Sequence, residues 1–552
     1  MPAPNRTQHQ SPRPSLRRLP LTHATLAVGL AALASTADAG FIFDTRALTQ
    51  TQAPGAAPGA LFDRLETPGI NAHGDLAFRG FLAGPGVDFS NDSGLWLHAA
   101  GTLQAVQIEG TTAPGTDAPF GIANPPKLDD LGRVAFKANL ETDFDTSAGL
   151  WVRDTNGTTT LQARAGDPAP GTAAGQTYSL QFGFPIAYSS SGQLAFRGGI
   201  VGTGVTGANN TGLWVQNDAG QIELAAREGD AAPGADPDEL FQGFSPPTIN
   251  RDGNTAFFAS LTGPGINSAN NAGLWTDRDG DLALLIREGD DAPGTSGRFI
   301  TPRPPSLNDA GHIAFASNLV GSGVSSTNNS GIWSDAGGTL ELIAREGDAA
   351  PGTDAVFGEL AGSSLNGRGE VAFTASVTGP TVQSDNNSAL WRQRDGSLEL
   401  VAREADPTPL GNAITYGNIG GFAFNSQGLM VFSSTLRGDG IDTTNDDALW
   451  LSDEDGNVQL IFQAGDLFDA NDDPLIEDLR TIERFNFAGG GGEQGQPTSL
   501  NATGQLAVRI EFTDDSVGIF TTTIPEPGAA ALALAGGLGL LGRSPKRRNP
   551  NA

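Results

Sequence analysis

The sequence predicts an all-β fold: an eight-bladed β-propeller of four-stranded repeats, each about 60 residues long, closed by its N-terminal strand. Three observations support this prediction. Tryptophan recurs with a period near 60 residues, and each unit contains four short strand-like segments. In addition, the last unit lacks one strand, and the N-terminal region has a segment that matches it.

Every tryptophan marks a repeat, and nearly all follow Gly-Leu or a close substitute. Upstream of each lies a glycine turn and an apolar pair, such as Gly74 with Ala77-Phe78. The eighth unit begins at Gly504 and ends with Phe520 where a tryptophan would stand. One indole ring in each unit, at a fixed strand position, predicts that the tryptophans pack in the core. Stacking of the indoles on sugars is the alternative. The markers are Trp96, Trp151, Trp214, Trp275, Trp333, Trp391 and Trp450.

Residues 355–403 show the four strands of one unit. "AVFGELAGSSL", "EVAFTASV", "ALWRQ" and "LELVARE" are separated by a turn, a polar loop and a hairpin at Asp395-Gly396. Apolar residues alternate or form short blocks bounded by Gly, Asn and Asp, as antiparallel strands require. No segment after residue 39 has helical periodicity.

The two ends of the repeated region predict a closed ring. Unit eight stops after Phe520 without its fourth strand, whereas "FIFDTRALTQ" near the N-terminus resembles that strand and precedes "APGAAPG". Pairing these segments buries the last exposed sheet edges. An open stack of sheets is the alternative, although it would need caps at both ends.

The tetrapeptide Arg-Glu-Gly-Asp ends the fourth strand of several units. Copies are Arg227–Asp230, Arg287–Asp290 and Arg345–Asp348, with the variants Arg403–Asp406 and Arg164–Asp167. All but the Arg403 copy run into Pro-Gly, which favours a turn between blades. A structural turn with an ion pair between blades is the first interpretation, and a repeated ligand or cation site is the second. Equal copies do not supply the unequal groups that catalysis needs.

Acidic turns give weak candidates for calcium binding. Asp277, Asp279 and Asp281 begin one oxygen-rich loop, and Asp453 and Asp455 begin another. Neither has the distal glutamate of an EF-hand, and Asp-Gly is also a common hairpin turn. The polar loops before each tryptophan, such as 268–273, predict Asx turns or a calcium or glycan face. Calcium therefore stays open as a cofactor, and no other is expected.

The composition excludes several function classes. Acidic residues exceed basic ones by 30, which disfavours nucleic acid as a partner. The absence of cysteine excludes disulfides, thiol catalysis and cysteine-bound metals. Gly at 75 and Pro at 35 predict many turns, while 38% hydrophobic residues suffice for a folded core.

Residues 1–39 have the features of an export signal. Arg17 and Arg18 precede an apolar run from Leu21 to about Leu33, and Ala37 and Ala39 fit a small-x-small cleavage rule. We expect cleavage before Gly40, by the general secretory route or the twin-arginine route.

Residues 524–552 carry a second signal. Pro525-Glu526-Pro527 is followed by fifteen uncharged residues, 528–542, and by the basic residues Arg543, Lys546, Arg547 and Arg548. This arrangement resembles the PEP-CTERM sorting signal of Gram-negative bacteria. The resemblance implies recognition by an exosortase, transient contact with the inner membrane, and transfer to the outer surface or exopolysaccharide matrix. A frayed apolar tail is the alternative.

The expected domains are therefore a signal peptide at 1–39, a propeller at 40–523 and a sorting tail at 524–552. Removal of both signals takes away eight basic residues and one acidic residue, which leaves 24 basic and 61 acidic residues. An insertion at 466–498 lengthens the spacing between units seven and eight. It is interpreted either as a binding loop or as extra chain length where the ring closes.

We expect an exported propeller at the cell surface or in a biofilm matrix, with a binding or structural role. We expect no enzyme and no catalytic residue, because the tyrosines Tyr178, Tyr188 and Tyr416 and the scattered histidines offer little for acid–base chemistry. The alternative is a carbohydrate-active propeller, either a calcium-dependent lectin or a polysaccharide lyase or hydrolase. Extracellular polysaccharide is the partner that either function would meet.

Overall fold

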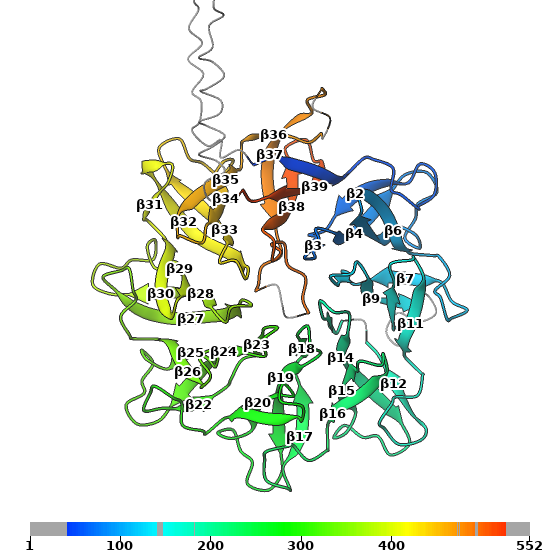
Figure 1. Cartoon of the computed structure of the whole chain (residues 1–552), viewed down its shortest axis with the longest axis vertical. Helices are drawn as coiled ribbons and strands as arrows, with labels where there is room; N and C mark the ends of the chain where they lie inside the picture. The colour runs from blue at the N-terminus through cyan, green and yellow to red at the C-terminus, as the bar shows by residue number, and fades with distance from the viewer. Residues whose placement is uncertain are drawn as a thin grey trace, which may run out of the picture. The chain divides into compact units, whose positions relative to one another are not determined.

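The computed structural model describes residues 41–140, 147–181, 183–471, 473, 475–491 and 495–525. All of them belong to one compact unit, Ala37–Ala552. Every regular element in these ranges is a strand, and eight sheets stand in a ring as the blades of a propeller (Figure 1). The predicted eight-bladed fold is confirmed. Within the same ranges, no helix has the length and apolarity needed to span a membrane.

Blades are numbered 1 to 8 in chain order. Blades 1 to 4 consist of β2 (Leu61–Leu65), β3 (Gly69–Ile70), β4 (Leu76–Ala83), β5 (Ser93–Ala99) and β6 (Thr102–Ile108); β7 (Phe120–Ala123), β8 (Lys127–Leu128), β9 (Val134–Leu140), β10 (Gly149–Arg153) and β11 (Thr159–Arg164); β12 (Gln176–Ser179), β13 (Ile186–Tyr188), β14 (Leu194–Gly202), β15 (Thr211–Gln216) and β16 (Ile222–Arg227); and β17 (Leu240–Phe244), β18 (Thr248–Ile249), β19 (Thr255–Thr262), β20 (Ala272–Thr276) and β21 (Ala283–Arg287).

Blades 5 to 8 consist of β22 (Arg298–Ile300), β23 (Ser306–Leu307), β24 (Ile313–Val320), β25 (Ser330–Ser334) and β26 (Glu341–Arg345); β27 (Val356–Leu365), β28 (Val371–Thr378), β29 (Ser388–Arg394) and β30 (Ser397–Arg403); β31 (Pro407–Thr408), β32 (Gly411–Phe424), β33 (Met430–Gly438), β34 (Asp447–Ser452) and β35 (Val458–Gln463); and β36 (Leu467–Asp469), β37 (Leu479–Asn486), β38 (Gln505–Phe512), β39 (Val517–Thr523) and β1 (Phe43–Leu48).

Each blade is an antiparallel sheet whose strands pair in chain order, as β17-β19-β20-β21 do. In blade 5, β24 is almost entirely buried, whereas β26, which ends the sheet order, has only one buried residue. Strand β24, which is second in the sheet order, is buried on both faces because each blade packs between two others. This explains why the sequence IAFASNLV opens with four consecutive apolar residues rather than with an alternating pattern.

The tryptophans form the core of the first seven blades, and all are fully buried. Each ring lies nearly parallel to the phenylalanine of the second strand and meets an aromatic ring of the first strand edge-on. For Trp333 the partners are Phe315, with centroids 6.1 Å apart, and Phe299, at 4.9 Å. Such offset and edge-to-face pairs are the favoured aromatic geometries. In blade 8, Phe520 takes the tryptophan position and meets Phe468 edge-on at 4.6 Å.

Six of the tryptophans also hold the turn that leads into their blade. The indole Nε1 donates to the carbonyl of the proline in the preceding Pro-Gly turn, as from Trp391 to Pro351 at 3.0 Å. The same bond joins Trp96 to Pro54, Trp151 to Pro114, Trp214 to Pro170, Trp275 to Pro233 and Trp333 to Pro293. Blade 7 lacks the Pro-Gly pair, and Trp450 donates to Ser434 Oγ instead. The Pro-Gly turn and the tryptophan are therefore one structural unit.

The ring closes as the sequence predicts. Strand β1 pairs antiparallel with β39, with Phe43 opposite Thr522 and Leu48 opposite Gly518. The N-terminal segment thereby supplies the outer strand of the last blade, so that the two ends of the chain share one sheet (Figure 1). Among the described residues, β1 thus covers the edge of β39 within blade 8, which an open stack would leave exposed.

The insertion before β38 has two parts. The described residues between 467 and 479 lengthen the hairpin formed by β36 and β37. Residues 487–491 and 495–499 instead run through the middle of the ring (Figure 1). There Gly490 exchanges backbone hydrogen bonds with Phe422 and Phe424 of blade 7, and Gly495 accepts one from Tyr188 of blade 3. We name these residues the axial segment.

Candidate functional site

A ring of buried residues surrounds the axis of the propeller. Each blade supplies one of them, from the turn just before its long buried strand, such as the turn before β24 in blade 5. Six are asparagines whose side-chain amide donates to the backbone carbonyl of the corresponding residue in the next blade. For Asn308 and Asn366 the distance from Nδ2 to the carbonyl oxygen is 2.9 Å. The other bonds run from Asn71 to Asp129, Asn250 to Asn308, Asn366 to Asn425, Asn425 to Asn501 and Asn501 to Asn71. The last of these crosses the seam, so the ring of turns is hydrogen-bonded across the point of closure.

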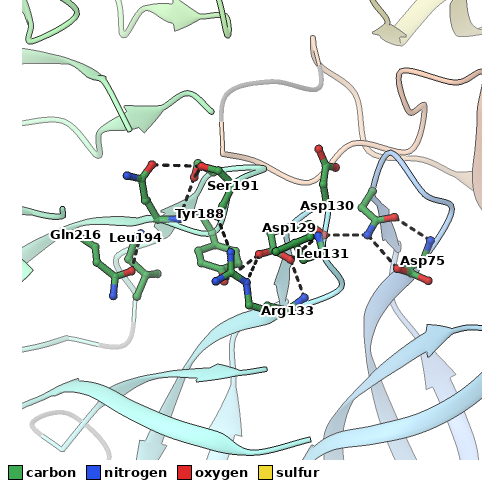
Figure 2. Close-up of polar contacts among 12 residues, drawn as sticks. Asp75, Asp129, Asp130, Leu131, Arg133, Tyr188, Ser191, Leu194 and Gln216 are labelled. Atoms are coloured by element: carbon green, nitrogen blue, oxygen red, sulfur yellow. Dashed lines mark hydrogen bonds and ion pairs between the residues drawn. The ribbon is translucent and has the colours of Figure 1, made fainter. Parts of the chain in front are cut away.

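The ring is interrupted at blades 2 and 3, where Ser189 and Asp129 replace asparagine. Figure 2 shows Asp129 with Arg133 and Tyr188 beside it. A carboxylate has no proton to donate, so Asp129 cannot bond to the next carbonyl. Arg133 replaces that bond: its Nε donates to Asp129 Oδ2 at 2.5 Å, and its Nη2 donates to Ser191 O at 2.5 Å. Gly192 makes this possible, since a Cβ there would overlap the Arg133 guanidinium. The repeats are therefore unequal at this point, which is what a specific site requires.

Burial dominates the electrostatics of this interruption. The Asp129 side chain is fully buried, and burial raises the pKa of its carboxyl although Arg133 opposes the shift. Tyr188 is also buried and its hydroxyl lies 3.5 Å from Asp129 Oδ2; burial, and then the Asp129 charge, raise the pKa of Tyr188. Lys127 donates to Gln496 of the axial segment at 2.6 Å, and burial lowers the pKa of Lys127 to about 8. Three ionisable groups with shifted pKa values thus gather beside the axis.

Two hollows adjoin the interruption. The first, of about 140 Å³, lies between the axial segment and the turns and is lined by Asp130, Ser190, Arg251 and Asp309 among others. The second, of about 550 Å³, lies over the turn of blade 3, and its lining includes Arg133, Gln193, Asn217, Asp218, Arg251 and Asp252. Arg251 lines both hollows. Its Nη1 lies 3.9 Å from Asp130, and its side chain is 60% exposed, so the guanidinium is accessible to a ligand.

The residues of the recurring tetrapeptide are architectural in the described blades. The glutamate is buried and accepts backbone N–H groups from the polar loop before the tryptophan strand; Glu404 accepts from Asn387 at 3.2 Å and from Ser388 at 3.1 Å. The arginine donates to a carbonyl of the same loop, as Arg345 does to Asn328 at 3.0 Å. The prediction of a structural turn is supported by these contacts. The arginine reaches a carbonyl of its own blade more often than a neighbour's carboxylate.

The calcium candidates lie in two separate turns. Asp277 accepts the backbone N–H of Thr255 at 2.5 Å, whereas Asp279 and Asp281 are exposed. Asp453 Oδ1 accepts the N–H groups of Asp455 and Asn457, which is an Asx turn. Over the described ranges, no group of three or more His, Asp or Glu side chains could hold a metal ion.

Most of the predicted processing residues lie outside the described residues. These are Ala37, Ala39, Glu526, Pro527, Arg543, Lys546, Arg547 and Arg548. Pro525 is described and directly follows Ile524, which is buried and donates its N–H to Gly504 O at 2.8 Å.

Sequence reasoning missed the ring of turns, and it singled out the insertion at 466–498 without predicting that its second half runs along the axis. A signal for the ring was present, because Asn, Asp or Ser stands three residues before the turn glycine in every unit, as Asn71 does before Gly74. The axial segment gave no such signal, since a glycine-rich stretch has no periodicity to read.

The chain belongs to the family described as "Family of unknown function (DUF7453)", whose pattern matches residues 24–290 and 260–531. No curated protein matches the chain. Solved structures similar to it include the β-propeller domain of the Trilobed protease from Pyrococcus furiosus, at 12% identity and a TM-score of 0.38, covering 73% of this chain and 99% of that one.

Two further solved structures are enzymes. The acylaminoacyl peptidase from Pyrococcus horikoshii is 15% identical with a TM-score of 0.37, covering 82% of this chain and 58% of that one. The sialidase from Trypanosoma rangeli is 10% identical with a TM-score of 0.25, covering 70% and 59%. The expectation that the chain is not an enzyme, which rested on its equal repeats and its few tyrosines and histidines, is corrected by these matches to propellers that belong to peptidases and a sialidase. The likeness is one of fold and assigns no catalytic residue here.

Proposed function

We propose that this member of the DUF7453 family is an exported β-propeller of a Gram-negative bacterium that is held at the outer surface or in the exopolysaccharide matrix and works by binding. The observation that carries the proposal is the place of the two chain ends. Phe43 and Thr522 are paired neighbours in blade 8, so both ends leave the propeller from the same sheet. Segments attached there can be removed without breaking the ring.

The N-terminal boundary suits cleavage by a signal peptidase. Cleavage before Gly40 would leave Gly40, Phe41 and Ile42 ahead of β1, which begins at Phe43. The strand that closes the ring would therefore stay whole. Because β1 can pair only after export has delivered the rest of the chain, closure would be the last step of folding.

The C-terminal boundary suits removal of the tail. Strand β39 ends at Thr523, and the Pro525-Glu526-Pro527 motif starts two residues later. An exosortase would thus meet its motif directly beyond the folded blade. Arg543, Lys546, Arg547 and Arg548 would hold the tail at the inner membrane until processing. The processed chain, with 61 acidic and 24 basic residues, would repel anionic surfaces and stay soluble in the matrix.

Processing can be tested by intact mass. In the native host, the protein released into the matrix should begin near Gly40 and end near Pro527. Glu526→Ala should keep the full tail and leave the protein in the membrane fraction, whereas Glu477→Ala, at an exposed site of blade 8, should be processed normally. Recovery of the unprocessed chain in the cytoplasm would contradict the proposal.

A carbohydrate-active role is the second candidate, and the hollow over blade 3 favours it. Arginine, amide and carboxylate groups line that hollow of about 550 Å³, and such planar polar groups suit a ligand rich in hydroxyls. Glycan-array binding with and without calcium would identify a lectin, and product release from a matrix polysaccharide would identify a lyase or hydrolase. Gln193→Ala should weaken either activity, with Gln383→Ala at an exposed position in the polar loop of blade 6 as the matched control. Unchanged activity in Gln193→Ala would place the carbohydrate elsewhere.

A further inference from the structure

At the outer rim of the propeller, an arginine fills the same space in four blades. It stands at the end of the last strand and donates to a backbone carbonyl of the polar loop before the tryptophan strand, with N···O distances of 2.9–3.1 Å. The pairs are Arg227 with Asn209, Arg287 with Asn270, Arg345 with Asn328 and Arg403 with Asn386. In blade 7, Gln463 makes the same bond to Asn445 at 2.6 Å.

Some of these arginines also meet a carboxylate on the segment that leads into the blade. Arg287 forms a two-pronged ion pair with Glu239, at 2.7 and 2.9 Å. Arg403 lies 3.7 Å from Asp354. The guanidinium therefore bridges the polar loop and the start of the blade, and it closes the space between them.

Blade 1 lacks this arginine. Ile108 holds the position, directly before Glu109 and Gly110. Its side chain has no donor, so it cannot bond to Asn91, which corresponds to Asn209 and its counterparts. The space is open: a hollow of about 380 Å³ is lined by Ile108, Asn91 and Glu109 on one side and by Gly55 and Ala60 on the other. Blade 8 has Leu48 at the arginine position, but its loop at 513–516 is a short hairpin turn. Among the blades in which a long polar loop and this strand end are both described, blade 1 alone has no donor there.

The polar loop of blade 1 differs at a second position. Phe89 is 88% exposed, although its neighbours Ser90 and Asn91 line the hollow. The residues at the same position in other blades are Gly207, Ser268, Ser326, Ser384 and Thr443. An exposed aromatic face beside a hollow that Glu109 lines attracts a guanidinium or ammonium group. Hydrogen bonds from Ser90 lower the pKa of the Asp88 carboxyl, so this loop keeps a negative charge.

We propose that the rim hollow of blade 1 binds an arginine side chain of a partner protein, in the space that other blades fill with their own arginine. The incoming guanidinium would donate to the Asn91 carbonyl, with the Phe89 ring over it and Glu109 at its edge. The partner would be a basic segment, which matches the acidic charge of the propeller. This inference holds whether or not the chain is processed at its ends.

The first test is a ligand-observed NMR titration of the whole protein with N-acetyl-arginine amide, N-acetyl-lysine amide and N-acetyl-citrulline amide. Citrulline has the same shape as arginine without the charge. We expect saturable binding of the arginine compound that is at least tenfold tighter than that of citrulline and that weakens with salt. Equal binding of arginine and citrulline, equal binding of arginine and lysine, or no saturable binding would each overturn the proposal.

The second test locates the site. Ile108→Arg should fill the hollow from within, as in blades 3 to 6, and reduce binding of the arginine compound at least tenfold. Phe89→Ser should reduce it about threefold or more by removing the ring. The gain-of-function control is Arg345→Ile, which should open a matching hollow in blade 5 and add a second, weaker site.

Folding is checked by the thermal unfolding midpoint, which Ile108→Arg should leave unchanged or raise. If Ile108→Arg fails to fold, Phe89→Ser decides the question, since Phe89 is exposed and its loss cannot disturb the core. Binding that is the same in Phe89→Ser and in the unaltered protein would place the arginine elsewhere and refute the assignment.

Discussion

Two junctions between blades differ in how the turns beside the axis are held together. Blades 8 and 1 meet at the seam, where the last and first parts of the ring come together. There Asn501 donates to Asn71 O at 2.8 Å, and Ile70 donates its N–H to Thr498 at 2.9 Å. Blades 2 and 3 follow each other directly along the chain, and there the amide bond is replaced by Asp129 and Arg133.

The comparison shows where a closed repeat fold can tolerate variation. At the seam the chain joins blades 8 and 1 only through β1, and β1 is held in blade 8 by non-covalent pairing with β39, so the amide hydrogen bond that most junctions use is retained there. Between blades 2 and 3 the chain joins two blades that are each continuous in sequence, and there the turn carries charged groups instead. The unequal, ionisable residues of the molecule accordingly gather far from the seam in sequence, around Asp129, Arg133 and Tyr188.

Removal of residues 41–48 should have the largest effect on the stability of the ring. Without β1, β39 becomes an open edge and the contacts of Phe43 with Phe468 are lost. We expect a loss of about 5 kcal/mol or more in the free energy of unfolding, comparable with the stability of a whole domain. Urea unfolding followed by tryptophan fluorescence measures it. Removal of residues 526–552 is the control and should leave the midpoint unchanged; equal midpoints for the two truncations would contradict closure.

Exchanging the residues of the two kinds of junction should have the next largest effect. Asn308→Asp would place a buried carboxylate 2.9 Å from the Asn366 carbonyl, with His312 instead of an arginine beside it, and should cost about 3 kcal/mol at neutral pH. Asp129→Asn can restore a donor toward blade 3 while it loses the Arg133 ion pair, and should change the free energy of unfolding by less than about 1 kcal/mol at neutral pH. Denaturant unfolding of both variants tests this, and similar costs would show that the junctions are equivalent.

The pH dependence of the stability of Asp129→Asn tests the role of the buried carboxylate at the junction of blades 2 and 3. Because burial raises the pKa of Asp129 in the folded state, the folded form binds this proton more readily than the unfolded form. The contribution of Asp129 to stability is thus fully present below its ordinary pKa of 3.8 and is lost as the pH rises through the folded value. The stability of Asp129→Asn relative to the unaltered protein should therefore increase from pH 3.5 toward neutrality. A difference that is constant with pH would contradict the role of burial.

The smallest effect concerns the tetrapeptide turns of blades 5 and 6. Gly347 has φ of 86°, and a Cβ there would lie 2.8 Å from the Thr327 carbonyl oxygen. Ala405 has the same role with φ of 67° and is strained for a non-glycine residue. Gly347→Ala should cost about 2 kcal/mol, and Ala405→Gly should gain about 0.5 kcal/mol. Thermal unfolding of the two variants gives both values; a loss of stability in Ala405→Gly would show that this turn has adapted to its side chain.

Much of the architecture could be predicted because its signals repeat. A tryptophan such as Trp333 recurs at one position in each of seven units, and the missing strand after Phe520 has a matching segment at Phe43–Leu48. These are local patterns that periodicity reveals. The bond from Trp333 to the Pro293 carbonyl joins two such signals, but only the packed blade shows that they touch.

The candidate site was less predictable because it depends on differences between repeats. Asp129 and Ser189 look like ordinary turn residues until the asparagine bonds of the other blades are seen. The axial segment meets blades 3 and 7 through backbone groups, as Gly495 does with Tyr188, and such contacts leave no trace in side-chain patterns. The role of Ile108 likewise becomes clear only by comparison with the arginines that fill the corresponding space in other blades.

The central claim, that β1 is paired into the last blade, can be tested most directly with an engineered disulfide. The chain has no cysteine, so Asp44→Cys with Thr521→Cys, which are opposite each other in β1 and β39, gives the only pair. We predict that this variant oxidises within one molecule and unfolds at a higher temperature than its reduced form, because the bond closes a very long loop. A failure to oxidise within one molecule, established by intact mass and a non-reducing peptide map, would contradict the closed ring.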